Sequence, residues 1–199
     1  QRLDQDALDR ALAEAGAFGG DVLMLDPSTG EILALASRRV DGDARVPAFT
    51  DPYEPGSTLK PFLLASLLAE GEASLGERVD TEGGVLKRDG RVIHDVHEAD
   101  TLSVAEVIRY SSNVGAAKLS DRLSPGLQYR YLRDFGFGLP TGIEYPAESP
   151  GRLRRPADWS GFSQASLAMG YEISVTSLQL AAAYAALANG GVLMRPHLV

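Results

Sequence analysis

The chain has 199 residues, 44% of them hydrophobic, and a formal net charge of −8. These values allow a sizeable core, and the negative charge argues against nucleic acid as a partner because phosphates carry charge of the same sign. There is no cysteine, which fits an oxidising compartment without disulfides as well as many cytosolic proteins.

Helical periodicity and capping signals predict helices, in chain order, at 3–15, 57–70, 102–110, from 'YSSNVG' (110–115) onward, at 125–135 and between Thr176 and Asn189. Strands are predicted at 22–26, at 31–36, in a hairpin over 85–95 with Asp89-Gly90 at its turn, and over 191–199. Polar or glycine- and proline-rich composition predicts loops at 38–56 and 136–163. This order of elements indicates an α+β domain with an incomplete sheet.

The sequence 'EPGSTLKPFLLASLLAEG' (54–71) predicts a helix that is apolar around almost its whole circumference, as is typical of a helix in the centre of a domain. Lys60 nevertheless lies in its first turn, in one helical row with Ser57. Pro61 is tolerated only near a helix start, so the helix begins close to Ser57. The motif also occurs by chance, as a capping serine and a lysine that reaches the surface.

The position of Ser57 and Lys60 at the start of a buried helix favours a catalytic role. A lysine desolvated at the positive end of a helix has its charged form disfavoured, and a neutral lysine can take the proton of a serine hydroxyl. Free backbone N–H groups at the same helix end can stabilise an oxyanion. We therefore predict Ser57 as an activated nucleophile and Lys60 as its base.

The sequence 'YSSNVG' (110–115) is typical of a helix start, since serine and asparagine cap helices. It also fits a second catalytic element. The Ser111 hydroxyl can relay a proton between Lys60 and a leaving amine, and the Asn113 amide can hold both a substrate carbonyl and the lysine. If both elements form one site, Lys60 Nζ should lie within hydrogen-bond reach of Ser57 Oγ, and Ser111 and Asn113 should converge on the same point.

Other polar clusters are weaker candidates. His94, Asp95, His97 and Glu98 lie close together, but 'HDVHEAD' is typical of the polar end of a hairpin, and His197 is the only distant histidine. We predict no metal site there.

Three glycine-containing segments are interpreted as structural. 'GFGLPTG' lacks the strand–turn–helix order of a dinucleotide site, so no cofactor is predicted. Asp26-Pro-Ser-Thr-Gly30 is a turn rather than a phosphate loop. Met169-Gly170-Tyr171 fits a ligand contact or a tight turn in the core, and we favour the turn.

Four segments together closely resemble the transpeptidase domain of class B penicillin-binding proteins. They are 'VLMLDPSTGEILALAS' (22–37), 'YEPGSTLKPF' (53–62), 'YSSNVGAAKL' (110–119) and 'SVTSLQLAAAYAALANGGVLMRPHLV' (174–199). The resemblance covers essentially the whole chain. It implies the serine penicillin-recognising, or β-lactamase/transpeptidase-like, fold, an antiparallel sheet with a helical subdomain. Within a partial domain over 1–199, we expect sheet-forming parts at 17–40 and 191–199 and a helical part at 55–190.

The resemblance also implies an activity. It is that of a peptidoglycan D,D-transpeptidase, which cross-links stem peptides in cell-wall synthesis for division or cell shape and is acylated by β-lactams. In this chain Ser57 would be the nucleophile, Lys60 its base, and Ser111 and Asn113 the second motif, with no cofactor or metal. The resemblance further implies an extracytoplasmic location, a membrane glycosyltransferase as partner, and an N-terminal membrane helix in the parent protein. The apolar runs of this chain are shorter than the ~20 residues of a membrane span.

One departure affects the expected activity. The family's third motif, Lys-Thr-Gly on a strand facing the serine, does not occur in residues 1–199. We interpret this as a truncation and expect a chain that ends at Val199 to be impaired or inactive. Two alternatives stay open, a β-lactamase or β-lactam sensor on the same fold, and a non-catalytic interaction module in which Ser57 is only a helix cap.

Overall fold

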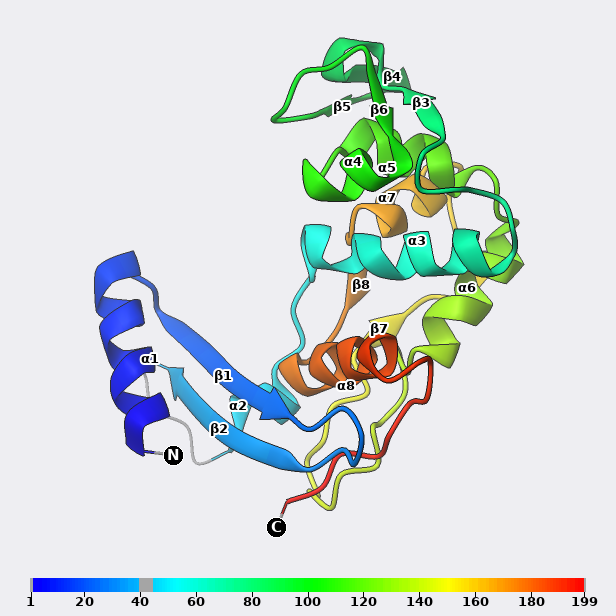
Figure 1. Cartoon of the computed structure of the whole chain (residues 1–199). Helices are drawn as coiled ribbons and strands as arrows, with labels where there is room; N and C mark the ends of the chain where they lie inside the picture. The colour runs from blue at the N-terminus through cyan, green and yellow to red at the C-terminus, as the bar shows by residue number, and fades with distance from the viewer. Residues whose placement is uncertain (1, 40–44, 199) are drawn as a thin grey trace. The chain divides into compact units, whose positions relative to one another are not determined.

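The computed structural model of the chain describes residues 2–39 and 45–198, which form two compact units (Figure 1). Among the described residues, the first unit comprises 2–39, 45–53, 133–152 and 174–198, and the second unit comprises 54–132 and 153–173. Helices and small two-stranded sheets occur together, which confirms the predicted α+β class.

The first unit contains a long antiparallel hairpin. β1 (Gly19–Leu25) pairs with β2 (Ile32–Arg39), and within the described residues neither strand pairs with a further strand. The helix α1 (Arg2–Ala15) lies against this hairpin, and α8 (Ser177–Ala188) packs against β1. The apolar runs of both strands are typical of a sheet that is covered on both faces. Leu33 of β2 is nevertheless 54% exposed, so the cover is incomplete at this position.

The core of this unit uses a short helix that the sequence analysis missed. The predicted loop 38–56 contains α2 (Pro47–Thr50), and Phe49 of α2 is buried. It packs with Ile32 and Leu178, and with Ile143 from the segment 136–163. The loop predicted at 136–163 therefore also contributes to this core, through Ile143.

The strand predicted over 191–199 is wrong for the residues that the structure describes. After α8, the Asn189 side chain accepts a hydrogen bond from Val192 N (2.8 Å) and donates one to Val192 O (2.7 Å). These backbone groups are therefore not free to join a ladder. The segment pairs with the residue before β2 through an isolated parallel bridge between Glu31 and His197.

The second unit is arranged around α3 (Lys60–Ala69), which follows the 3₁₀ turn η1 (Gly56–Leu59). Its other elements are β3 (Arg78–Asp80), η2 (Glu82–Gly84), β4 (Val85–Arg88), β5 (Arg91–His94), β6 (Thr101–Ser103), α4 (Val104–Arg109), α5 (Asn113–Ser120), most of α6 (Pro125–Asp134), η3 (Pro156–Asp158) and α7 (Ser163–Ala168). The short strands β7 (Arg152–Leu153) and β8 (Ile173–Ser174) pair with each other.

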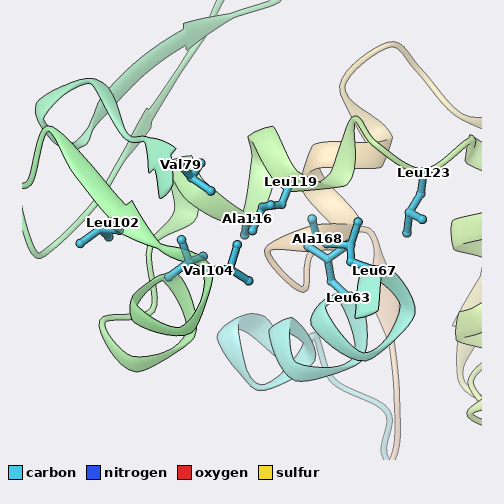
Figure 2. Close-up of a cluster of buried hydrophobic side chains, with 10 residues drawn as sticks. Leu63, Leu67, Val79, Leu102, Val104, Ala116, Leu119, Leu123 and Ala168 are labelled. Carbon is cyan, nitrogen blue, oxygen red and sulfur yellow. The ribbon is translucent and has the colours of Figure 1, made fainter. Parts of the chain in front are cut away.

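Buried apolar side chains hold α3 against its neighbours. Figure 2 shows this cluster, whose members are Leu63, Leu67, Val79, Leu102, Val104, Val107, Ala116, Leu119, Leu123 and Ala168. Helices α4 and α5 approach closely at Gly115, where an added Cβ would lie 2.5 Å from a methyl carbon of Val107. Leu67 is fully buried, so its truncation to alanine would cost about 2–5 kcal/mol.

The predicted hairpin over 85–95 is confirmed. β4 and β5 pair antiparallel from Val85–His94 to Arg88–Arg91. Asp89 (φ 50°) and Gly90 (φ 74°) form its exposed turn, and two positive φ values are those that a type I′ turn requires.

Candidate active site

Ser57 and Lys60 lie where the 3₁₀ turn η1 passes into α3. Pro61 occupies the first turn of α3, where its missing N–H leaves no hydrogen bond unmade. The Ser57 side chain faces solvent, whereas Lys60 is only 1% exposed. Lys60 Nζ lies 2.9 Å from Ser57 Oγ, so the predicted hydrogen-bond distance between these two atoms is confirmed.

The second predicted element converges on the same nitrogen. Lys60 Nζ lies 3.0 Å from Ser111 Oγ, 2.6 Å from Ser111 O and 2.8 Å from Asn113 Oδ1. Ser111 has a φ of 56°, in the left-handed region that side-chain-bearing residues rarely adopt. In this conformation both the carbonyl and the hydroxyl of Ser111 contact Lys60.

The four contacts determine how a neutral Lys60 would direct its hydrogens. The Ser111 carbonyl and Asn113 Oδ1 can only accept hydrogen bonds. The orientation of the Asn113 amide follows from its other end, because Nδ2 donates to the carbonyl of His94 at 3.0 Å. A neutral amine has two hydrogens, and if they point at these two acceptors its lone pair is left for a hydroxyl. The Ser57 hydroxyl, 2.9 Å away, can donate to it.

The surroundings of Lys60 favour that neutral form. Burial lowers the pKa of Lys60 to about 8 from its ordinary value of 10.5, although the charge of Asp95 acts in the opposite direction. At neutral pH about one molecule in ten would then hold an unprotonated Lys60, far more than for an exposed lysine.

Asp95 joins β5 to the second element, a role that the sequence did not reveal. Its Oδ1 accepts from the backbone N–H groups of Asn113 (2.5 Å) and Val114 (2.9 Å), and its Oδ2 accepts from the Ser112 hydroxyl. Ser112 also caps α5 by accepting from Gly115 N at 2.8 Å. These contacts give Ser112 a structural role at the start of α5.

The backbone just before Ser57 is held by the turn after α7. The Gly56 N–H donates to Gly170 O at 3.0 Å, which agrees with the interpretation of 169–171 as a tight turn. Gly170 has a φ of 86°, and a Cβ added there would lie 1.8 Å from Gly56 O. No side chain fits at position 170 unless Gly56, the residue before Ser57, moves.

Glu172, two residues after Gly170, makes further contacts with this part of the chain. Its N–H donates to Glu54 Oε1 at 3.0 Å, and its carboxylate contacts Arg154 and accepts from Ser163 Oγ at 2.7 Å. Burial raises the pKa of Glu172, but hydrogen bonds from Ser163 and Ser166 and the charge of Arg154 outweigh burial and lower it overall.

Two of the residues weighed as metal ligands, Asp95 and His97, have other partners. His97 stacks on Tyr110 with ring centroids 4.1 Å apart. The Asp95 carboxylate accepts hydrogen bonds from the first residues of α5. Within 2–39 and 45–198, no group of three or more His, Cys, Asp or Glu side chains could hold a metal ion. No helix in the same ranges is long and apolar enough to span a membrane.

Comparison with known proteins identifies the family. Residues 20–199 match the penicillin binding protein transpeptidase domain. The chain belongs to this family. PbpC of Pseudomonas aeruginosa, a probable peptidoglycan D,D-transpeptidase, is 36% identical over 198 residues, which cover 94% of this chain and 35% of that protein. PenA of Neisseria gonorrhoeae, also a probable peptidoglycan D,D-transpeptidase, is 37% identical over 204 residues, which cover 98% of this chain and 35% of that protein.

Solved structures share the fold of this chain. Penicillin binding protein 3 of Mycobacterium tuberculosis, complexed with ampicillin, gives a TM-score of 0.92 at 33% identity, over 99% of this chain and 46% of that one. A peptidoglycan glycosyltransferase from Burkholderia ambifaria gives a TM-score of 0.90 at 34% identity, over 96% and 59%. The predicted penicillin-recognising fold is therefore confirmed. The chain spans about a third of the length of the curated relatives that it matches.

Proposed function

We propose that the protein is a serine-type D,D-transpeptidase that cross-links peptidoglycan stem peptides through an acyl-enzyme on Ser57 and is acylated there by β-lactams. The observation that carries this proposal is the buried Lys60 Nζ, which lies within 3.0 Å of Ser57 Oγ, Ser111 Oγ and Asn113 Oδ1. The names of the relatives support the substrate class, and the ampicillin complex of a structural neighbour supports β-lactam binding.

In the acylation step, neutral Lys60 takes the proton of the Ser57 hydroxyl while Ser57 Oγ forms a bond to the carbonyl carbon of the donor stem peptide. The carbonyl oxygen becomes an oxyanion. The C–N bond to the leaving residue then breaks, and the departing amine needs a proton. Ser111 Oγ, 3.0 Å from Lys60 Nζ, delivers its own proton to that amine and recovers one from the lysine.

The second half-reaction uses the same groups in reverse order. The amine of an acceptor stem peptide attacks the ester carbonyl, its proton passes through Ser111 to Lys60, and Ser57 Oγ leaves with a proton from the lysine. The product is a new amide between the two peptides. Asn113 has one amide end on His94 O and the other on Lys60, so it holds the lysine in place through both stages.

Labelling with a fluorescent penicillin tests the proposal directly. The full-length protein should form a stable covalent adduct, and Ser57→Ala should abolish it because the hydroxyl is the attacking group. Ser120→Ala is a matched control, since Ser120 is buried and donates to Ala117 O, outside the site. A wild-type protein that does not label would favour the non-catalytic interaction module, and labelling that survives Ser57→Ala would assign the nucleophile elsewhere.

The lifetime of the adduct separates two enzymes on this fold. A transpeptidase should hold the β-lactam as a long-lived acyl-enzyme, whereas a β-lactamase should turn over a chromogenic cephalosporin rapidly. We infer a transpeptidase because a lactamase needs a base that activates water for deacylation, and class A lactamases use a carboxylate for this step. Among the described residues, the carboxylate next to the site is Asp95, and it already accepts three hydrogen bonds from the start of α5.

The family resemblance extends the proposal to the parent protein. We propose an extracytoplasmic location with an N-terminal membrane anchor, and a membrane glycosyltransferase of the cell-wall machinery as partner. A Lys-Thr-Gly strand would add oxyanion and carboxylate contacts, so a protein that ends at Val199 should acylate on the order of 10²-fold more slowly than one that includes such a strand. Acylation rates of the two forms measure this, and equal rates would make the third motif dispensable.

A further inference from the structure

Asp95 takes no part in the reaction above, yet it contacts the second element of the site. Its backbone N–H donates to Gly84 O at 2.9 Å, which fixes the residue at the end of β5. Its carboxylate accepts three hydrogen bonds, from the Ser112 hydroxyl and from the N–H groups of Asn113 and Val114. The first turn of a helix leaves such N–H groups without intrahelical partners. A carboxylate at this position accepts their hydrogen bonds and is also stabilised by the positive end of the helix dipole.

The residues held by Asp95 directly follow the strained one. Ser111 has a φ of 56°, and that conformation places its carbonyl 2.6 Å and its hydroxyl 3.0 Å from Lys60 Nζ. Strained conformations persist only where the surroundings fix them. Lys60 holds the turn from one side, and Asp95 holds the next two residues from the other. His94 adds a third restraint, because its carbonyl accepts from the Asn113 side chain.

Asp95 is also the charged group that acts on the lysine. Burial lowers the pKa of Lys60, and the charge of Asp95 raises it. The side chains that contact Lys60 Nζ, those of Ser57, Ser111 and Asn113, are neutral. Removal of the charge at position 95 should therefore shift the pKa of Lys60, because none of the side chains that contact Nζ carries a charge that could offset it.

We propose that Asp95 is a positioning residue of the acylation proposed above, which fixes Ser111 and Asn113 around Lys60 and sets the pH range in which that lysine acts as a base. The inference rests on the proposed function. It differs from a purely structural role, in which Asp95 would only attach the β4–β5 hairpin to α5.

A second contact between the same hairpin and the same helix supplies the matched control. Arg88 of β4 donates to both carboxylate oxygens of Asp121, at 2.7 and 2.9 Å, and Asp121 is the C-cap residue of α5. Asp121→Asn removes one negative charge and one hairpin–helix contact, as Asp95→Asn does, but at the end of the helix away from Lys60. Ser112→Ala removes a hydrogen bond to Asp95 and leaves the charge.

The experiment measures the second-order rate of acylation by a fluorescent penicillin in the full-length protein, from about pH 6 to about pH 10, together with thermal unfolding. Asp95→Asn should move the midpoint of the pH profile to lower pH, because protonated Lys60 loses its nearby anion, and should lower the plateau rate about 10-fold or more. Ser112→Ala should lower the plateau several-fold without moving the midpoint. Asp121→Asn should do neither.

Two results would overturn the inference. One is an Asp95→Asn profile that superimposes on the wild-type profile, and the other is an equal loss of rate in Asp121→Asn, which would leave only hairpin attachment. If Asp95→Asn does not fold, the Ser112→Ala variant provides the test. A plateau rate equal to that of wild type in Ser112→Ala would contradict the proposal that Asp95 positions the site through its hydrogen bond with Ser112. Failure of the proposed function is recognised separately, because wild type and Ser57→Ala would then label alike, and the inference falls with it.

Discussion

Gly170→Ala should slow acylation of Ser57, the proposed nucleophile, although position 170 contacts Gly56 and not Ser57. An alanine Cβ at this position would lie 1.8 Å from Gly56 O, and ordinary contact begins at 3.4 Å. Gly56 or the turn at 170 must therefore move by about 1.6 Å, and the neighbour of Gly56 in the chain is Ser57. A misplacement of about 1 Å can cost a reaction about 10²-fold, or about 2.7 kcal/mol in the barrier, so we expect acylation to slow by at least that factor.

The control for this variant is Gly71→Ala. Gly71 follows α3, has a φ of 71° and would meet nothing within 4 Å if a Cβ were added. Both variants carry the cost of a left-handed alanine, about 1–2 kcal/mol, but only Gly170→Ala displaces Gly56. Stopped-flow acylation by a fluorescent penicillin and thermal unfolding of both variants give the comparison. Acylation of Gly170→Ala within a few-fold of Gly71→Ala, in a folded protein, would refute the argument that this contact positions the serine.

Three further predictions concern Lys60. Wild-type acylation should rise with pH and level off above about pH 8, because burial lowers the pKa of Lys60 to about 8 and only the neutral amine is a base; a rate that does not change over this range would contradict it. Lys60→Arg should abolish penicillin labelling, since arginine stays protonated, and labelling at a near wild-type rate would remove Lys60 from the mechanism. Because the unfolded chain keeps the proton of Lys60 up to a pKa of 10.5 while the folded protein releases it near 8, the unfolded state binds more protons between these values. The free energy of unfolding of wild type should therefore gain up to about 3 kcal/mol over that of Lys60→Met between pH 8 and 10.5 in urea unfolding; a constant difference between the two proteins would exclude the shift.

The parts of the site that local sequence determines were predictable. Ser57 and Lys60 are three residues apart, so helical spacing alone brings them together, and Asp89-Gly90 predicts its hairpin turn through a backbone preference. The pairing of Lys60 with Ser111 and Asn113 came from the two motifs and from the family resemblance. It is confirmed as geometry by the distances to Lys60 Nζ.

The parts that were missed depend on contacts between distant segments. Asp95 reads in the sequence as the polar end of a hairpin, and only the docking of β5 on α5 gives its carboxylate three donors. Gly170 reads as a turn residue, and its approach to Gly56 depends on the packing of α7. The strand predicted over 191–199 failed for a local reason, because Asn189 occupies the backbone groups of Val192 that a ladder would need.

The exposed turn at Asp89 and Gly90 separates the two halves of the site along the chain. A protease that nicks this turn would leave Ser57 and Lys60 on one peptide and Ser111 on the other. The acyl group would remain on the N-terminal peptide in a denaturing gel, although its attachment had required groups from both. Penicillin labelling of the nicked protein would thus report whether the two peptides stay associated. The reaction could then be used to measure how well separate fragments of this chain reassemble.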